Sequence, residues 1–354
     1  MYAEKLDKII DVMRPIDRDG LMDRIDRYIL DIETYHKEVD KILEQKYDND
    51  LMFSPKFALF RANLINFGFS KGTHRDFLSF CNHIKSIELY RLQQRVLFLS
   101  HFIYIDTNNY LYQQFADFLN KRETIAIASY HYSNYKALVH YLLTLNVDLF
   151  IITGRRQKSN LEDEALDLAY MYKMVNGYES SITFITAEDK TSLVEVYQAM
   201  KEAGKRTKIL LIYIDGNIGH LGHQIKNNSS YHFKGIRISM REGLNILLAI
   251  LKLPIFSVYI DDRNLIPEVK FLNIYTAKTK DIVSPLLCEL ENIVSTKEFF
   301  KWECLMYLHH WILNKDSLPI PKSNEDKTIP VLSLGEWFNF NTHNYLYVQD
   351  EKNS

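Results

Sequence analysis

The chain has 354 residues, of which 47% are hydrophobic and 25% are charged, and its formal net charge at pH 7 is −2. This composition is typical of a globular protein and excludes a mostly disordered chain. A net charge so close to zero provides no general attraction for nucleic acid, so we expect no nucleic-acid partner. The length indicates one large α/β domain with an added helical layer, or two modest domains.

The N-terminal part, up to about residue 115, has the pattern of amphipathic helices covering a larger core. Apolar residues recur there at three- and four-residue steps between charged ones, in the series Leu21, Ile25, Ile29, Ile32, Tyr35, Val39 and Ile42. Residues 92–105 are a second apolar helical candidate. Because the first 13 residues carry charged side chains throughout, we expect neither a signal peptide nor a membrane anchor.

From about residue 120, short β-rich runs alternate with helical patterns. The strand candidates are residues 124–129, 148–153, 182–186, 209–214, 255–260 and 270–275, with helical patterns at 161–175 and 193–200. Strands that are nearly continuous in apolar residues are expected where helices cover both faces of a sheet. We predict an α/β fold with a mixed, mostly parallel sheet flanked by helices.

The predicted organisation is an N-terminal helical layer at residues 1–115, an α/β core at 116–315, and a proline-containing loop and tail at 316–354. The most apolar stretch, 244–260, is interrupted by Lys252 and Pro254, so it is too short to span a bilayer. The chain has three scattered cysteines, Cys81, Cys288 and Cys304, which fit a reducing compartment. We expect a cytoplasmic protein, for which peripheral membrane contact stays open.

Polar residues follow three of the predicted strands, at the edge where a parallel sheet places its functional groups. His131 comes just after the strand at 124–129, before a helical pattern that begins near Lys136. A histidine on such a turn can act as a general base, or it can be a buried structural residue. Taken alone, the two alternatives are about equally supported.

The other two strand ends carry an acid and a basic cluster. The strand at 209–214 ends in Asp215, Gly216 and Asn217, which can present a carboxylate and backbone N–H groups to a substrate or simply form a turn. The strand at 148–153 ends in Gly154, Arg155 and Arg156. Two arginines there suit a phosphate or carboxylate, although a solvated basic loop is the simpler alternative.

Taken in order, these segments resemble the lysophospholipid acyltransferase-like superfamily, and in layout its lipid A acyltransferase branch. The family carries a histidine with an acid after four intervening residues, a basic segment, an acid-Gly motif and a Pro-containing strand. The corresponding residues here are His131, Gly154-Arg155-Arg156, Asp215-Gly216 and the strand after Pro254. The resemblance covers roughly residues 110–315. It implies transfer of an acyl group from coenzyme A or an acyl carrier protein to a hydroxyl or amine, without cofactor or metal.

The first motif of that branch typically reads His-Phe-Gly-Asn-Trp-Glu, and this chain has His131-Tyr-Ser-Asn134-Tyr-Lys136. The resemblance therefore implies His131 as the general base and Asn134 as a substrate-binding residue. Lys136 stands where the family has its catalytic acid, and a protonated lysine cannot accept the imidazole N–H. Three alternatives follow: Asp215 or another acid orients His131, the chemistry has changed, or the protein is a catalytically silent binding or scaffold protein. We favour the first.

The remaining expected substrate contacts are Lys136, Arg155, Arg156, Gly216 and Asn217, with the two arginines holding a phosphate of the donor or acceptor. His220 and His223 form an H-x-x-H in a Gly-rich loop, with His232 nearby. This is not the H-E-x-x-H of zinc proteases, so a loop histidine pair is favoured over a metal site. His309 and His310 are expected to be packing residues on a helix with Trp311.

Overall fold

The structure of the protein is a computed structural model. It describes residues 55–69, 72–73, 75–84, 87, 103–154, 169, 173, 180–186, 190–202, 204–218, 228–241, 243–261, 267–276, 281–296, 298–311, 328–332, 336–339 and 344–347. These residues form two compact units. The first contains the described residues between Ser86 and Asn217 and those of Gly243–Leu286. The second contains the described residues before Ser86, those between Ile218 and Glu242, and those from Leu287 onward.

The first unit is built on a seven-stranded sheet with the order β1-β9-β8-β2-β5-β3-β4. Five neighbouring strands are parallel, β9 is antiparallel to β8, and β1 is parallel to β9. The strands are β1 (Tyr104–Ile105), β2 (Ile125–Ser129), β3 (Val147–Thr153), β4 (Ser181–Thr186), β5 (Thr207–Tyr213), β8 (Ile255–Asp261) and β9 (Glu268–Tyr275). The predicted α/β class with a mixed, mostly parallel sheet is therefore confirmed.

All six strands expected from the apolar runs are present, with bounds within two residues of the prediction. β2 lies in the middle of the sheet, and each of its residues is buried. The seventh strand, β1, falls inside the run at 92–105 that was predicted to be helical. That prediction is wrong at residues 104–105, where the backbone pairs with Glu268 and Val269 of β9 instead of forming a helix.

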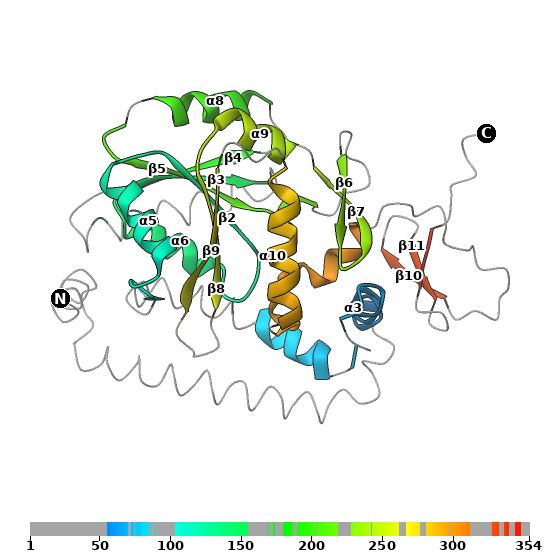
Figure 1. The fold of residues 1–354 in the computed structure, drawn as a ribbon. Coiled ribbons are helices and arrows are strands. Elements are labelled where there is room, and N and C mark those ends of the chain that lie inside the picture. Colours follow the sequence, from blue (N-terminus) through cyan, green and yellow to red (C-terminus); the bar gives the residue numbers. More distant parts are fainter. Residues whose placement is uncertain are drawn as a thin grey trace, which may run out of the picture. The chain divides into compact units, whose positions relative to one another are not determined.

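The helices of this unit are α5 (Tyr110–Asn120), α6 (Lys136–Leu143), α8 (Lys190–Lys201) and α9 (Gly243–Leu251), and α10 (Val283–Thr296) begins in it. α6 connects β2 to β3, whereas α8 and α9 precede β5 and β8 and carry the chain in the opposite direction across the sheet. Because such crossovers share one hand, helices of opposite direction cover opposite faces. In Figure 1, α5 lies beside α6 and α8 lies beside α9.

Aromatic rings fill the core beneath α5. Phe115 of α5 packs on Phe256 and Phe271, with ring centroids 5.4 and 5.2 Å apart. Such tilted or edge-to-face pairs contribute about 0.5–1.5 kcal/mol beyond the burial of their area. The buried apolar residues of α5 and α6 join those of the central strands in one cluster. The packing of this cluster holds in place the strands whose ends carry the site.

The second unit combines α3 (Pro55–Asn66), a hairpin of β6 (Asn228–Phe233) and β7 (Ile236–Arg241), and the 3-10 helices η5 (Phe299–Lys301) and η6 (Glu303–His310). Phe233 packs on Trp302 and Trp311 with centroids 5.5 and 5.7 Å apart. Lys234 and Gly235 connect the hairpin strands with φ values of 51° and 77°, the left-handed pair that a tight hairpin turn needs.

The second unit also contains a three-stranded antiparallel sheet of β10 (Thr328–Leu332), β11 (Glu336–Asn339) and β12 (Asn344–Tyr347). The sequence indicated a loop and tail for this region and gave no signal for these strands. The pattern from Leu21 to Ile42 and most of the helical pattern at 161–175 lie outside the described residues. Within the part of the chain that the structure describes, none of the helices has the length and hydrophobicity of a membrane span.

Candidate active site

The candidate site lies where two neighbouring parallel strands end. β2 and β5 pair along their length, with Ser129 opposite Tyr213, so the residues two positions further on also lie close together. From β2 the chain crosses to β3 on one side of this pair, and from β5 it crosses to β8 on the other side. Ligands of open α/β sheets bind outside the carboxyl ends of strands at such a switch in direction.

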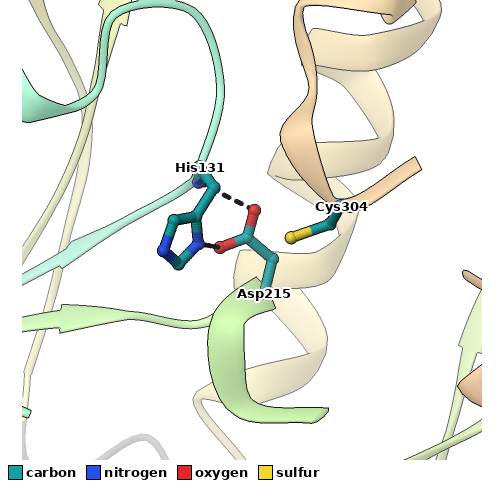
Figure 2. Close-up of side chains that lie close together, drawn as sticks. All are labelled: His131, Asp215 and Cys304. Atoms are coloured by element: carbon teal, nitrogen blue, oxygen red, sulfur yellow. Dashed lines mark hydrogen bonds and ion pairs between the residues drawn. The ribbon is translucent and has the colours of Figure 1, made fainter. Parts of the chain in front are cut away.

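His131 and Asp215 meet at this point through two hydrogen bonds, which Figure 2 shows as dashed lines. The backbone N–H of His131 donates to Oδ2 of Asp215 at 2.8 Å, and ring atom Nδ1 lies 2.8 Å from Oδ1. The Asp215 side chain is fully buried, whereas 22% of the His131 side chain is exposed. The structure therefore brings Asp215 into contact with the imidazole of His131.

This contact decides which ring nitrogen of His131 carries the proton. A carboxylate can only accept hydrogen bonds, so a neutral imidazole places its proton on Nδ1 and its lone pair on Nε2. The backbone bond holds the same carboxylate from a second direction. An imidazole oriented in this way by a buried carboxylate is the arrangement of a general base.

No protein-family model and no curated protein matches this chain.

Gly216 makes room for the imidazole ring. A methyl group on Gly216 would lie 2.4 Å from Cε1 of His131 and 3.3 Å from Nδ1, which no side chain tolerates without movement. The backbone of Gly216 is not left-handed, so the close approach of the ring, and not the backbone conformation, requires glycine here. The sequence predicted Gly216 as a substrate contact, and the structure adds this packing role.

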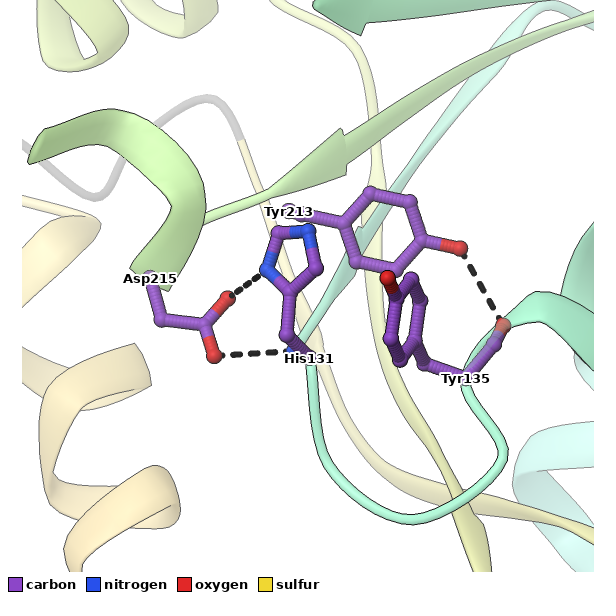
Figure 3. A network of polar contacts seen from close by, with 4 residues as sticks. All are labelled: His131, Tyr135, Tyr213 and Asp215. Carbon is purple, nitrogen blue, oxygen red and sulfur yellow. Dashed lines mark hydrogen bonds and ion pairs between the residues drawn. The ribbon is translucent and has the colours of Figure 1, made fainter. Parts of the chain in front are cut away.

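Two tyrosines surround the imidazole, as Figure 3 shows. The rings of Tyr135 and Tyr213 each have their centroids 4.6 Å from that of His131, at interplanar angles of 69° and 37°. The Tyr213 hydroxyl donates to the backbone oxygen of Tyr135 at 3.2 Å. Burial, and secondarily the charge of Asp215, raises the pKa of Tyr213 far above its usual value. Tyr213 is therefore a neutral wall of the site.

The other expected substrate contacts have different outcomes. Asn134 lies in the turn after His131 and is buried, and its backbone oxygen accepts from Ala137 at the start of α6. Lys136 is the first residue of α6 and is half-buried, with Nζ 5.9 Å from the centroid of the Tyr135 ring. Both belong to the segment that carries His131, and their binding roles stay predictions.

Several expected site residues lie outside the described residues: Arg155, Arg156, His220, His223, and the side chains of Asn217, His309 and His310. Gly154, which precedes the arginines, directly follows β3, the neighbour of β5. The arginine cluster therefore follows a strand end at the same edge of the sheet as Asp215. His232 lies on β6 in the second unit and is exposed.

Sequence reasoning missed Tyr213 and Ser133. Tyr213 is the last residue of β5, after a run of four aliphatic residues, and stands two residues before Asp215. Ser133 has a left-handed backbone with φ of 57°. The available signal was that Ser133 occupies the position of a glycine in the resembling motif.

Proposed function

We propose that this protein is an acyltransferase that moves an acyl group from a thioester donor to a hydroxyl or amine acceptor, with His131 as general base. The observation that carries the proposal is the pair of hydrogen bonds from His131 to the buried carboxylate of Asp215. The resemblance in motif order supports the reaction class. The donor is coenzyme A or the phosphopantetheine of an acyl carrier protein, and the setting is cytoplasmic.

The reaction follows from the orientation of the imidazole. Nε2 of His131 takes the proton of the acceptor as its oxygen or nitrogen attacks the thioester carbonyl. The new bond gives a tetrahedral intermediate with a negative oxygen, which needs hydrogen-bond donors nearby. When the intermediate collapses, the C–S bond breaks and the thiolate takes the proton from Nε2. Asp215 stabilises the imidazolium that forms between the two steps.

A second candidate function is a catalytically silent binding or scaffold protein, which Lys136 favours because it replaces the acid of the resembling family. Asp215 supplies a carboxylate on Nδ1 of His131, so the enzymatic proposal needs no acid at position 136. Under the silent alternative the wild type binds donor without turnover, and Lys136→Glu creates activity. Under the acyltransferase proposal the wild type is active, and Lys136→Glu does not raise its rate.

The test is thiol release and product formation from acyl-CoA and acyl carrier protein donors with a panel of hydroxyl and amine acceptors. We expect wild-type turnover and losses of about 10²–10⁴-fold in kcat/KM for His131→Ala and Asp215→Asn. Asp148→Asn is the matched control, since Asp148 on β3 pairs with Arg206 at 2.6 Å, away from the carboxyl ends of the strands. Wild-type rates in His131→Ala would exclude the proposed base.

A further inference from the structure

The turn that follows His131 contains buried polar atoms that the proposed proton transfer does not use. Ser133 is fully buried at 0% exposure and Asn134 is 6% exposed. Among the residues that the structure describes, neither Oγ of Ser133 nor Oδ1 of Asn134 has a hydrogen-bond partner. Buried polar groups in folded proteins nearly always have partners, so each exception needs an explanation.

Ser133 is unfavourable here for a second reason. Its φ of 57° is left-handed, which costs roughly 1–2 kcal/mol for a residue with a Cβ atom. A buried hydroxyl without a partner costs a further ~1–3 kcal/mol. Glycine would remove both penalties, because it has neither a Cβ atom nor a hydroxyl. Strained residues of this kind cluster at active sites, where the surrounding structure holds them in place.

We propose that the Ser133 hydroxyl is the hydrogen-bond donor for the carbonyl oxygen of the acyl donor, and for the oxyanion that this atom becomes. The inference rests on the proposed acyl transfer and names a catalytic group for it. Ser133 is two residues from His131 on the same turn, so the proposal places the base and the donor on one short segment. A buried donor with no competing partner is already desolvated, which makes its bond to a developing negative charge stronger.

The chemistry of this contact is a hydrogen bond only. Ser133 keeps its proton throughout, and the negative charge stays on the substrate oxygen until the thiolate leaves. Asn134 is the second buried polar residue of the turn. Its unpartnered side-chain oxygen suits the O–H or N–H of the acceptor, which would align that group for attack.

The kinetic test compares two substitutions at Ser133 with a matched control. Ser133→Gly removes the hydroxyl and the strain, whereas Ser133→Ala removes the hydroxyl and keeps the strain. We expect kcat to fall by about 10²-fold in both, with KM for the donor little changed and with Ser133→Gly the more stable of the two. Ser129→Ala is the control, because its hydroxyl is also buried without a partner among the described residues but belongs to the last residue of β2 and not to the turn, and it should keep wild-type kcat.

A second readout separates this inference from the activity assay. The probe is a decanoyl-CoA analogue in which a methylene group replaces the thioester sulfur and the carbonyl carbon is ¹³C. On binding to the wild type, the carbonyl resonance should move downfield because the oxygen is polarised by a donor. The shift should be smaller in Ser133→Gly and unchanged in Ser129→Ala.

The outcomes are distinguishable. Wild-type kcat and a wild-type carbonyl shift in Ser133→Gly, with His131→Ala inactive, would overturn the role of Ser133 and leave the acyltransferase proposal intact. No turnover by the wild type, together with no binding of the analogue, would overturn both. Loss of turnover and of the downfield shift in Ser133→Gly, with both kept in Ser129→Ala, would support the assignment.

Discussion

The imidazole of His131 is enclosed by three residues from the end of a single strand. Asp215 contacts Nδ1, Gly216 lies against Cε1, and the ring of Tyr213 packs beside the imidazole plane. These residues come from the last position of β5 and the turn after it, and the backbone N–H of Ile214 donates to the oxygen of Ser129 at 3.0 Å. The strand pairing and the orientation of the ring are therefore coupled.

The packing against Gly216 gives a direct prediction. Gly216→Ala places a methyl group 2.4 Å from Cε1 of His131, so the ring has to move from its position beside Asp215. We expect kcat/KM to fall at least ~10-fold and the melting temperature to decrease. In a His131→Ala background the same substitution should have little effect on the melting temperature. Equal destabilisation in both backgrounds would show that Gly216 is required for a reason other than the ring.

At the scale of elements, a buried lysine ties α8 to β5. Lys208 of β5 is 8% exposed, and its Nζ donates to the backbone oxygens of Glu202, at 2.8 Å, and of Ala199. These oxygens lie at the end of α8, where the helix dipole favours a cation. Gly204 leaves space for this side chain, since a methyl group there would lie 2.9 Å from Cε of Lys208.

Removal of the Lys208 hydrogen bonds should lower the stability of the fold and leave the geometry around His131 unchanged. We expect Lys208→Met to lower the free energy of unfolding by about 2 kcal/mol. Two charge-assisted hydrogen bonds are lost, and the two carbonyl oxygens lose their bond from Nζ. Lys205→Met, at an exposed lysine nearby, is the control and should change stability by less than ~0.5 kcal/mol. Urea unfolding measures both. Similar values for the two variants would contradict the capping role.

His140 on α6 makes the free energy of unfolding depend on pH. Burial lowers the pKa of His140 to about 3 in the folded protein, whereas an unfolded histidine titrates near ~6.5. Between these values the unfolded chain binds a proton that the folded chain does not, so stability falls as the pH decreases from about 6.5 to about 3. This loss amounts to at most ~1.4 kcal/mol per pH unit.

His140→Gln should therefore make the pH dependence of unfolding less steep in this window. The measurement is urea unfolding at a series of pH values between about 7 and 4. His232→Gln is the control, because His232 is exposed on β6. The same slope in His140→Gln and in the wild type would mean that His140 is not the group that binds the proton on unfolding.

At the scale of the whole molecule, much of the first unit could be predicted from sequence. Nearly continuous apolar runs identified five of the long strands, because a strand covered on both faces has to be apolar along its length. The sixth, at residues 270–275, was expected although Lys270 and Asn273 interrupt its apolar residues. The positions of His131 and Asp215 after two of these strands indicated one edge of the sheet. Both features are local patterns in the sequence, and they are the same whichever strands are neighbours in the sheet.

The pairing of β2 with β5 could not be predicted, because it joins residues that are 84 positions apart and apolar runs do not specify their neighbours. The hairpin of β6 and β7 was missed although Ile236, Ile238 and Met240 alternate with polar residues, since its Lys234-Gly235 turn lacks the usual Asn-Gly or Asp-Gly signal. β1 is too short to have a pattern of its own. The left-handed backbone of Ser133 also depends on tertiary context.

The central claim is that Asp215 holds His131 as a neutral base with its proton on Nδ1. The most direct measurement is a long-range ¹H–¹⁵N correlation spectrum of the histidine rings in the wild type, with His131→Gln to assign the signals. In the neutral ring, we expect Nδ1 of His131 to resonate as a protonated nitrogen and Nε2 as one with a lone pair. We expect Asp215→Asn to lose this preference. A proton on Nε2 in the wild type, or a spectrum of His131 unchanged by Asp215→Asn, would contradict the account.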